Sequence, residues 1–127
     1  SREFGSGGRL IGKRLAARLG IPFTFHQDAP VIRPDILETV WCAVERRMKD
    51  GSVLGPEEQV DVWTALKAVT ANAAYQYFEE DQKGTLAPGK RADLVVLDRD
   101  PTRTAGESLR TIRVLETWKD GVRVFER

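Results

Sequence analysis

The sequence predicts an α/β fold, or an α+β fold when the 127-residue chain is considered by itself, with helices followed by a short antiparallel sheet. Two observations predict it. Apolar residues recur at helical spacing through most of the first two thirds of the chain. From Lys83 onward, turn residues and β-branched runs replace that pattern. With 41% hydrophobic residues, the chain is expected to form a modest core.

The N-terminal part is expected to hold one helix and one strand. Residues 1–8 are small, polar and glycine-rich without periodicity, so we predict a linker outside the fold. Over residues 9–19 the apolar side chains follow helical spacing, which predicts an amphipathic helix that Gly20 ends. The apolar run at residues 22–25 is predicted to be a strand.

Further helices are predicted in the middle of the chain. Asp35 is expected to cap a helix that continues to about Lys49 and ends at an Asp-Gly pair. Asp61 is expected to cap the next one. Residues 70–72 should interrupt or kink that helix before residues 73–78, because Thr and Asn side-chain oxygens offer backbone amides another partner.

The last third of the chain is predicted to form three strands. Residues 92–98 are typical of a buried strand and residues 113–118 of an alternating one. Residues 122–125 should pair with the second strand across a hairpin turn at Asp120-Gly121. Three strands form only part of a sheet, so their apolar faces need a partner from elsewhere.

Composition limits the classes of function. Lys plus Arg number 20 and Asp plus Glu 19, for a net charge of +1, which argues against a nucleic-acid partner. No apolar run approaches the roughly 18 residues of a membrane-spanning helix, so we expect no membrane partner. The single cysteine, Cys42, and the lack of a secretory segment predict a cytoplasmic protein with a reduced thiol packed in a helix.

The most informative residues are His26 and Asp28, at the end of the predicted strand. Side chains alternate along a strand, so the two should share one face while Gln27 takes the other. A carboxylate beside an imidazole at the mouth of a parallel barrel is typical of metal-dependent hydrolysis. However, His26 is the only histidine. A catalytic zinc site usually takes three protein ligands, so any such site is incomplete here.

Structural interpretations of the same residues remain open. Asp28 can instead cap the turn at residues 29–31. His26 can be a hydrogen-bonded strand residue, or it can orient Asp28 without touching a substrate. Arg33 is interpreted as solvated rather than bound to a substrate carboxylate. Core packing is the predicted role of the three tryptophans, Trp41, Trp63 and Trp118.

Residues 83–98 (KGTLAPGKRADLVVLD) closely resemble the C-terminal signature of the amidohydrolase superfamily, and residues 114–124 (VLETWKDGVRV) resemble its closing hairpin. Members of that superfamily share a TIM-like barrel and a small β-sandwich. The resemblance implies that residues 9–82 form the C-terminal part of the barrel, including its last strand. It implies that residues 83–127 form strands of the sandwich.

Residues 25–31 (FHQDAPV) and 70–74 (TANAA) resemble one branch more narrowly, that of N-substituted formamide deformylases and exoenzyme regulatory proteins. By this resemblance, Asp28 ends the last barrel strand, contacts the catalytic metal and shuttles the proton of the attacking water. His26 matches a histidine that this branch carries beside the aspartate. The implied metal is zinc or another divalent ion.

The superfamily's other metal ligands, including the His-x-His of its first strand, have no counterpart in this chain. The resemblance therefore implies a C-terminal fragment of a hydrolase that cleaves a non-peptide C–N bond in a small amide or N-formyl compound. Alone, the fragment is expected to be inactive and to bind no metal. The alternative is a non-catalytic regulatory or assembly module that forms a homodimer through its exposed sheet and helices.

Overall fold

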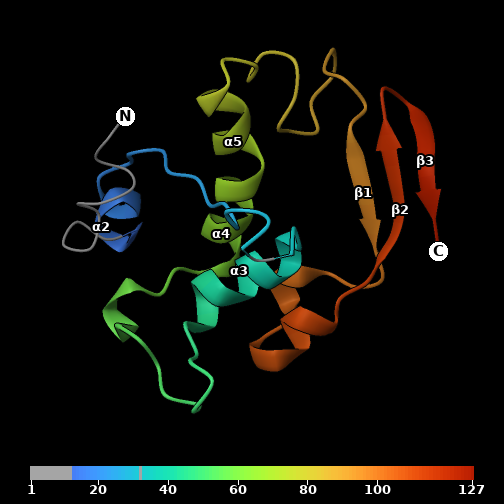
Figure 1. The fold of residues 1–127 in the computed structure, drawn as a ribbon. Helices are drawn as coiled ribbons and strands as arrows, with labels where there is room; N and C mark the ends of the chain where they lie inside the picture. The colour runs from blue at the N-terminus through green and yellow to red at the C-terminus, as the bar shows by residue number, and fades with distance from the viewer. Residues whose placement is uncertain (1–12, 32) are drawn as a thin grey trace.

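The computed structural model describes residues 13–31 and 33–127 (Figure 1). Helices occupy the first part of the chain and the sheet the last part, which confirms the mixed fold. The predicted linker and the start of the predicted helix at residues 9–19 lie outside the described residues. The elements, with η for 3₁₀ helices, are α2 (Lys13–Arg18), α3 (Ile36–Glu45), η1 (Pro56–Glu58), α4 (Val62–Val69), α5 (Ala71–Gln76), β1 (Leu94–Leu97), η2 (Pro101–Arg103), η3 (Gly106–Thr111), β2 (Val114–Lys119) and β3 (Val122–Glu126).

The main core lies between α3, α4 and the segment that precedes α3. Ala43 of α3 and Ala65 and Ala68 of α4 are buried, and small side chains at such positions let two helices approach closely. Phe23 packs against them, and burial of a phenylalanine side chain contributes roughly 1.5–3 kcal/mol. The buried residues of this cluster are Phe23, Val40, Ala43, Val60, Ala65 and Ala68.

Both predicted helix caps are confirmed. The carboxylate of Asp35 accepts a hydrogen bond from the Glu38 backbone N–H at 3.1 Å, so it satisfies one free amide of α3. Asp61 does the same for α4 through the Thr64 N–H, at 2.9 Å, and also accepts from the Thr64 hydroxyl at 2.7 Å. These bonds lower the pKa of Asp61, the hydroxyl bond most strongly.

The predicted end of α3 was wrong. The helix stops at Glu45 instead of continuing to Lys49, because Arg46 adopts a left-handed conformation with φ 49°. The Arg46 guanidinium donates to the Leu54 carbonyl, 2.5 Å away, and Arg47 pairs with Val53 in an antiparallel bridge. The chain therefore turns back in a short hairpin-like loop where helical spacing alone predicted another turn of helix.

The predicted interruption near residue 70 is confirmed. Thr70 has φ −124° and ψ −89°, which separates α4 from α5. Its hydroxyl donates to the Leu66 carbonyl at 2.7 Å, the back-bonding that bends helices at threonine. The second part ends at Gln76, earlier than predicted, and Phe78 has φ 59°.

The three predicted strands form one antiparallel sheet in the order β1-β2-β3 (Figure 1). Leu94 pairs with Trp118 and Glu116 with Glu126. Asp120 and Gly121 both have positive φ, 51° and 77°, as a type I′ hairpin turn requires. The strands and their Asp-Gly turn were therefore predicted correctly, with ends that differ by one or two residues.

The expected burial of the first strand was wrong. Val95 and Val96 of β1 are 53% and 40% exposed, and every residue of β3 is exposed. Only Leu97 of β1 packs against a core, a second apolar cluster built on Trp41, Leu109 and Ile112. An apolar run predicts a strand with two apolar faces. Burial of those faces requires other elements packed against the sheet, and the described residues provide such elements only near Leu97.

The predicted strand at residues 22–25 is also absent among the described residues. Residues 21–27 form a segment that is neither helix nor paired strand. Extended backbone becomes a strand only when a neighbour bonds to it, and here α5 provides the bonds instead, through side chains.

Candidate active-site segment

Side chains of residues 25–27 alternate between the helices and solvent. Phe23 is buried, and Phe25 packs against the same core. Their rings meet edge to face with centroids 5.5 Å apart. Gln27 is half-buried against α3, whereas His26 is exposed. The period of two that the sequence indicated is therefore kept between residues 25 and 27 although no strand is paired here.

Two hydrogen bonds attach the start of this segment to α5. The side-chain amide of Asn72 donates to the Phe23 carbonyl at 2.9 Å, and the Thr24 hydroxyl donates to Gln76 Oε1 at 2.8 Å. Asn72 was predicted only to interrupt a helix. In the structure it satisfies a backbone carbonyl that has no bond to a strand.

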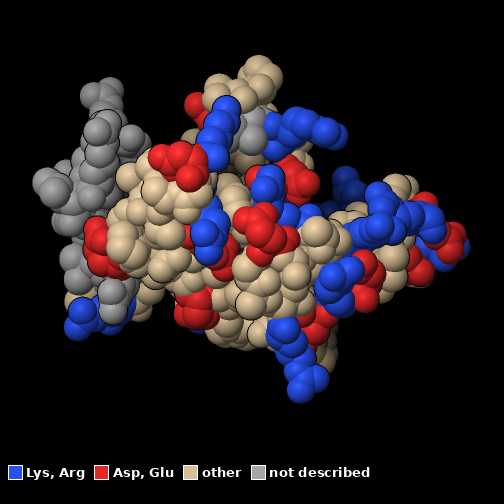
Figure 2. Space-filling model, turned by 90° about the horizontal axis from the view of Figure 1, so that it is seen from below, with Lys and Arg blue, Asp and Glu red and all other residues tan. Residues whose placement is uncertain are grey.

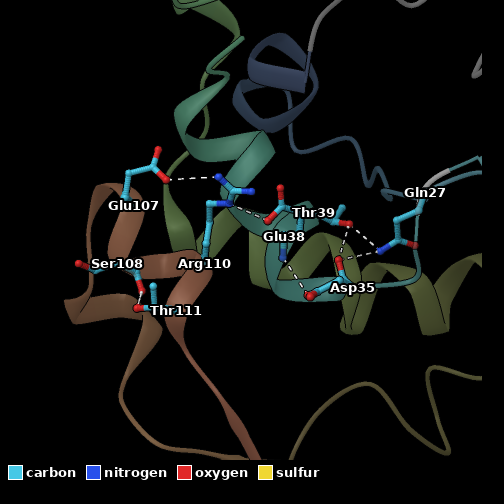
Figure 3. Close-up of polar contacts among 8 residues, drawn as sticks. All are labelled: Gln27, Asp35, Glu38, Thr39, Glu107, Ser108, Arg110 and Thr111. Atoms are coloured by element: carbon cyan, nitrogen blue, oxygen red, sulfur yellow. Dashed lines mark hydrogen bonds and ion pairs between the residues drawn. The ribbon is translucent and has the colours of Figure 1, made fainter. Parts of the chain in front are cut away.

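The end of the segment is attached to the first turn of α3 (Figure 3). The side-chain amide of Gln27 donates to the Thr39 hydroxyl at 2.6 Å and to the Asp35 carbonyl at 3.1 Å. The Thr39 hydroxyl donates to the same carbonyl at 3.0 Å. From the sequence, Gln27 was predicted only to face the side of the strand opposite His26 and Asp28. Its contact with Thr39 was missed because the two residues are 12 positions apart and no sequence pattern links them.

Asp28 begins a turn immediately after the segment. It has φ 54°, in the left-handed region where Asp and Asn are more common than other residues with a Cβ. Its backbone carbonyl accepts from the Val31 N–H at 2.8 Å. The main chain thus closes this turn, and the exposed carboxylate of Asp28 remains accessible to solvent.

His26 and Asp28 offer a nitrogen and an oxygen donor, both suitable for zinc. In residues 13–31 and 33–127, however, no group of three or more His, Cys, Asp or Glu side chains is placed to hold a metal ion. The described residues therefore fit a contribution to a metal site and do not fit a complete one.

A second set of contacts connects α3 with η3. Arg110 of η3 lies 4.3 Å from the centre of the Trp41 ring, a cation–π arrangement. Its Nε donates to Glu38 at 2.8 Å (Figure 3). Glu38 lies in the first turn of α3, next to Thr39. The helix turn that bonds to Gln27 is therefore also bonded to η3, in the C-terminal part of the chain.

The residues before β1 hold the hairpin in place. The Arg91 guanidinium makes two hydrogen bonds to the Asp120 carboxylate. The Asp93 carboxylate accepts from the Asp120 N–H at 2.8 Å, and the Gly121 N–H donates to the Ala92 carbonyl at 3.1 Å. The Arg-Ala-Asp part of the signature at residues 83–98 therefore has a structural role at the β2–β3 turn.

Two open hollows in the described part of the chain, of about 330 and 160 Å³, lie beside α4, and neither is lined by His26 or Asp28. On the face drawn in Figure 2, acidic and basic side chains are interspersed. Among the described helices, none has the length and apolar character needed to cross a membrane.

Other residues considered from the sequence lie apart from this segment. Cys42 is on α3 and is exposed, so its predicted packing was wrong. Arg33 is exposed, as expected. Of the tryptophans, Trp41 is buried and Trp118 half-buried, but Trp63 is 61% exposed, which contradicts a core role for it.

Comparisons with known proteins identify the family. The profile of the Amidohydrolase family matches residues 13–125. An N-substituted formamide deformylase of Arthrobacter pascens is 38% identical over 119 residues, which are 94% of this chain and 22% of that protein. The chain thus spans about a fifth of the length of this relative.

One solved structure also matches, an amidohydrolase from Thermotoga maritima MSB8. It is 23% identical in sequence and has a TM-score of 0.45, with 90% of this chain and 34% of that chain covered. The family profile extends over nearly all described residues, from α2 to β3. The chain belongs to the amidohydrolase family.

Proposed function

We propose that this chain is the C-terminal part of a metal-dependent hydrolase that cleaves a non-peptide C–N bond in a small amide or N-formyl compound. The family match and the 38% identity to an N-substituted formamide deformylase support the reaction class. Because the chain spans 22% of that relative, the remaining metal ligands and most substrate contacts belong, in this proposal, to sequence outside the chain.

One structural observation carries the proposal: the segment at residues 21–28 packs Phe23 and Phe25 against the helical core and leaves His26 and Asp28 exposed at its end. A strand of a TIM-like barrel is arranged in the same way, with helices outside it and catalytic side chains at its C-terminal end. In this proposal, residues 9–82 complete the barrel and residues 83–127 contribute strands to a β-sandwich. The exposed faces of β1 and β3 would then contact the other strands.

Asp28 is the catalytic residue that this chain contributes. Zinc, or another divalent ion, supplies a bound water of lowered pKa when it is present. The Asp28 carboxylate accepts the proton of the attacking water and returns it to the nitrogen of the leaving amine as the C–N bond breaks. Asp28 also provides one oxygen ligand to the metal, and His26 lies next to the reacting groups.

A hybrid enzyme tests this proposal. The matching C-terminal part of the Arthrobacter pascens deformylase is replaced by residues 9–127 of this chain, and hydrolysis of an N-substituted formamide is measured. We expect metal-dependent activity that a chelator removes, and no activity from the deformylase truncated before the replaced part. A hybrid that folds and binds metal as the deformylase does, yet hydrolyses no amide or N-formyl compound, would contradict the proposal.

A second candidate function is self-association without catalysis. The favouring observation is the apolar surface of the edge strand β3, where Val122, Val124 and Phe125 are 63%, 59% and 45% exposed. Exposed edge strands pair readily with other chains. Sedimentation of the purified chain tests this second candidate, which requires a stable dimer without metal, and a monomer contradicts it.

A further inference from the structure

Gln27 lies between the two residues of the proposed site, and its half-buried side chain bonds to the first turn of α3, whereas His26 and Asp28 are exposed. We propose that Gln27 is a positioning residue, which fixes His26 and Asp28 relative to the rigid first turn of α3. This inference rests on the proposed function, because it assigns Gln27 a role in the same reaction. Neither the family match nor the resemblance of residues 25–31 assigns a role to this side chain.

The donors and acceptors define the orientation of the Gln27 amide. The Asp35 carbonyl can only accept, so the nitrogen of the amide must face it. The same NH₂ group donates its other hydrogen to the Thr39 hydroxyl at 2.6 Å. The hydroxyl in turn donates to the Asp35 carbonyl at 3.0 Å. Each hydrogen in this triangle has one acceptor, and reversal of the amide would place two oxygens against each other.

Several further contacts hold Asp35 and the first turn of α3, to which Gln27 bonds. The Asp35 carbonyl also accepts the Thr39 N–H at 3.1 Å, a bond of the first helical turn. The Asp35 carboxylate caps the Glu38 N–H, and the Glu38 side chain accepts from Arg110 at 2.8 Å. Figure 3 shows this continuous set of contacts, which runs from Gln27 through the start of α3 to η3.

In the described part of this chain, residues 21–27 pair with no strand, so side-chain contacts hold the segment. In the longer enzyme of the proposed function, the Gln27 bonds would act together with the pairing of the barrel strands. Consecutive Cα atoms are about 3.8 Å apart, so a fixed Gln27 restricts where its two neighbours can lie. Asp28 enters its left-handed turn directly after this anchor. Loss of the Gln27 bonds would leave the segment attached mainly through Phe23, Thr24 and Phe25.

Substitutions that nearly keep side-chain size distinguish the effect of the Gln27 hydrogen bonds from the effect of packing. Gln27→Glu keeps the shape but cannot donate when ionised, and its charge faces the Asp35 carbonyl. Thr39→Val removes the hydroxyl, whereas Thr39→Ser keeps it and should restore the contact. The matched control is Gln82→Glu, the same chemical change at an exposed residue in the loop between α5 and β1.

The first test uses this chain alone and needs no activity. In ¹⁵N–¹H spectra, we expect Gln27→Glu and Thr39→Val to move the backbone signals of His26 and Asp28. The signals of β1 to β3 should stay in place. Thr39→Ser and Gln82→Glu should leave His26 and Asp28 unchanged. Because a substitution at residue 27 moves the signals of its chain neighbours in any case, Thr39→Val decides: if it leaves the His26 and Asp28 signals at their original positions, the inference is wrong, whatever the activity of the longer enzyme.

The second test uses the hybrid enzyme. We expect Gln27→Glu to lower kcat on the order of tenfold, with KM and metal content within about twofold and an unchanged melting temperature. Thr39→Val should act in the same direction, and Thr39→Ser should recover most of the rate. An unchanged kcat, or a loss explained by a smaller folded fraction, overturns the positioning role. Full activity of the hybrid carrying Asp28→Asn would instead overturn the proposed function, and the spectra would still decide whether Gln27 holds its neighbours.

Discussion

Arg91 binds Asp120 through two parallel hydrogen bonds, of 2.8 Å from Nε and 3.0 Å from Nη2, and so joins the chain before β1 to the turn between β2 and β3. The pair spans 29 positions in the sequence. Two parallel bonds between guanidinium and carboxylate give geometric specificity that a single bond to lysine lacks. We interpret this pair, with Asp93, as the structural reason for the Arg-Ala-Asp sequence in the signature segment.

The variant Asp120→Asn separates the ion pair from the turn. An Asn-Gly pair forms a type I′ turn at least as well as Asp-Gly, so the turn is kept while residue 120 loses its charge and one of the two oxygens that accept from Arg91. We expect faster amide hydrogen exchange at Gly121 and along β3, and no change in α3 or α4. Exchange measured by mass spectrometry checks this. Unaltered exchange at Gly121 would show that the turn alone holds the hairpin.

The Arg91–Asp120 pair predicts that the stability of the hairpin depends on pH. The hydrogen bond from Arg91, followed by its charge, lowers the pKa of Asp120 below the ordinary aspartate value. A carboxyl group with a lowered pKa in the folded state stabilises that state above the unfolded pKa, near 3.9, and loses the effect as the pH falls through the folded pKa. Relative to the intrinsic exchange rate at each pH, the protection of the Gly121 amide should therefore decrease below about pH 4 in the parent chain and less so in Asp120→Asn.

Gly84 should tolerate no side chain. A Cβ at this position would lie 2.6 Å from the Ala74 Cβ and 3.1 Å from the Ala71 Cα, and φ is 91°. We expect Gly84→Ala to lower the free energy of unfolding by about 2 kcal/mol or more. Gly89→Ala is the control, since φ is 86° there but nothing lies within 4 Å. Its cost should be about 1 kcal/mol, from backbone strain alone. Equal costs in urea unfolding would exclude the clash with α5.

The predictions from sequence succeeded where the signal is local. Asp35 and Asp61 cap helices because the residue type and its place before an apolar run decide this, and Asp120-Gly121 forms its turn for a similar reason. Burial of β1 was predicted wrongly because it depends on a second layer that the run itself does not encode. The contacts of Gln27 with Thr39 and of Asn72 with Phe23 join distant residues, so no periodicity revealed them. The roles of His26 and Asp28 remain predictions that rest on the family resemblance.

The cap at Asp61 has a measurable contribution of its own. Removal of a helix-capping carboxylate typically costs about 1 kcal/mol, because the amide that it satisfied is left without a partner. We expect Asp61→Ala to lower the free energy of unfolding by about that amount. Asp61→Asn, which can still accept from the Thr64 N–H, should retain most of the stability. Equal losses in the two variants would mean that the charge and not the hydrogen bond stabilises α4.

Leu109 should be the most sensitive leucine in the C-terminal part of the chain. It is 1% exposed and lies between Trp41 and Ile112 in the second cluster. Leu109→Ala should cost about 3 kcal/mol, from lost burial and a new cavity. Leu86→Ala makes the same change at a side chain that is 87% exposed and should cost less than about 0.5 kcal/mol. Urea unfolding compares the two, and similar losses would contradict the packing of η3 against α3.

The role of Asp28 is the central claim, and the rate of amide hydrolysis by the hybrid enzyme carrying Asp28→Asn tests it most directly. Asp81→Asn, the same change at another exposed aspartate, is the control. We predict that Asp28→Asn lowers kcat by a factor on the order of 10² to 10⁴, the range of general acid–base catalysis, while Asp81→Asn retains the full rate. A folded, metal-loaded Asp28→Asn hybrid with the kcat of the control would contradict the account.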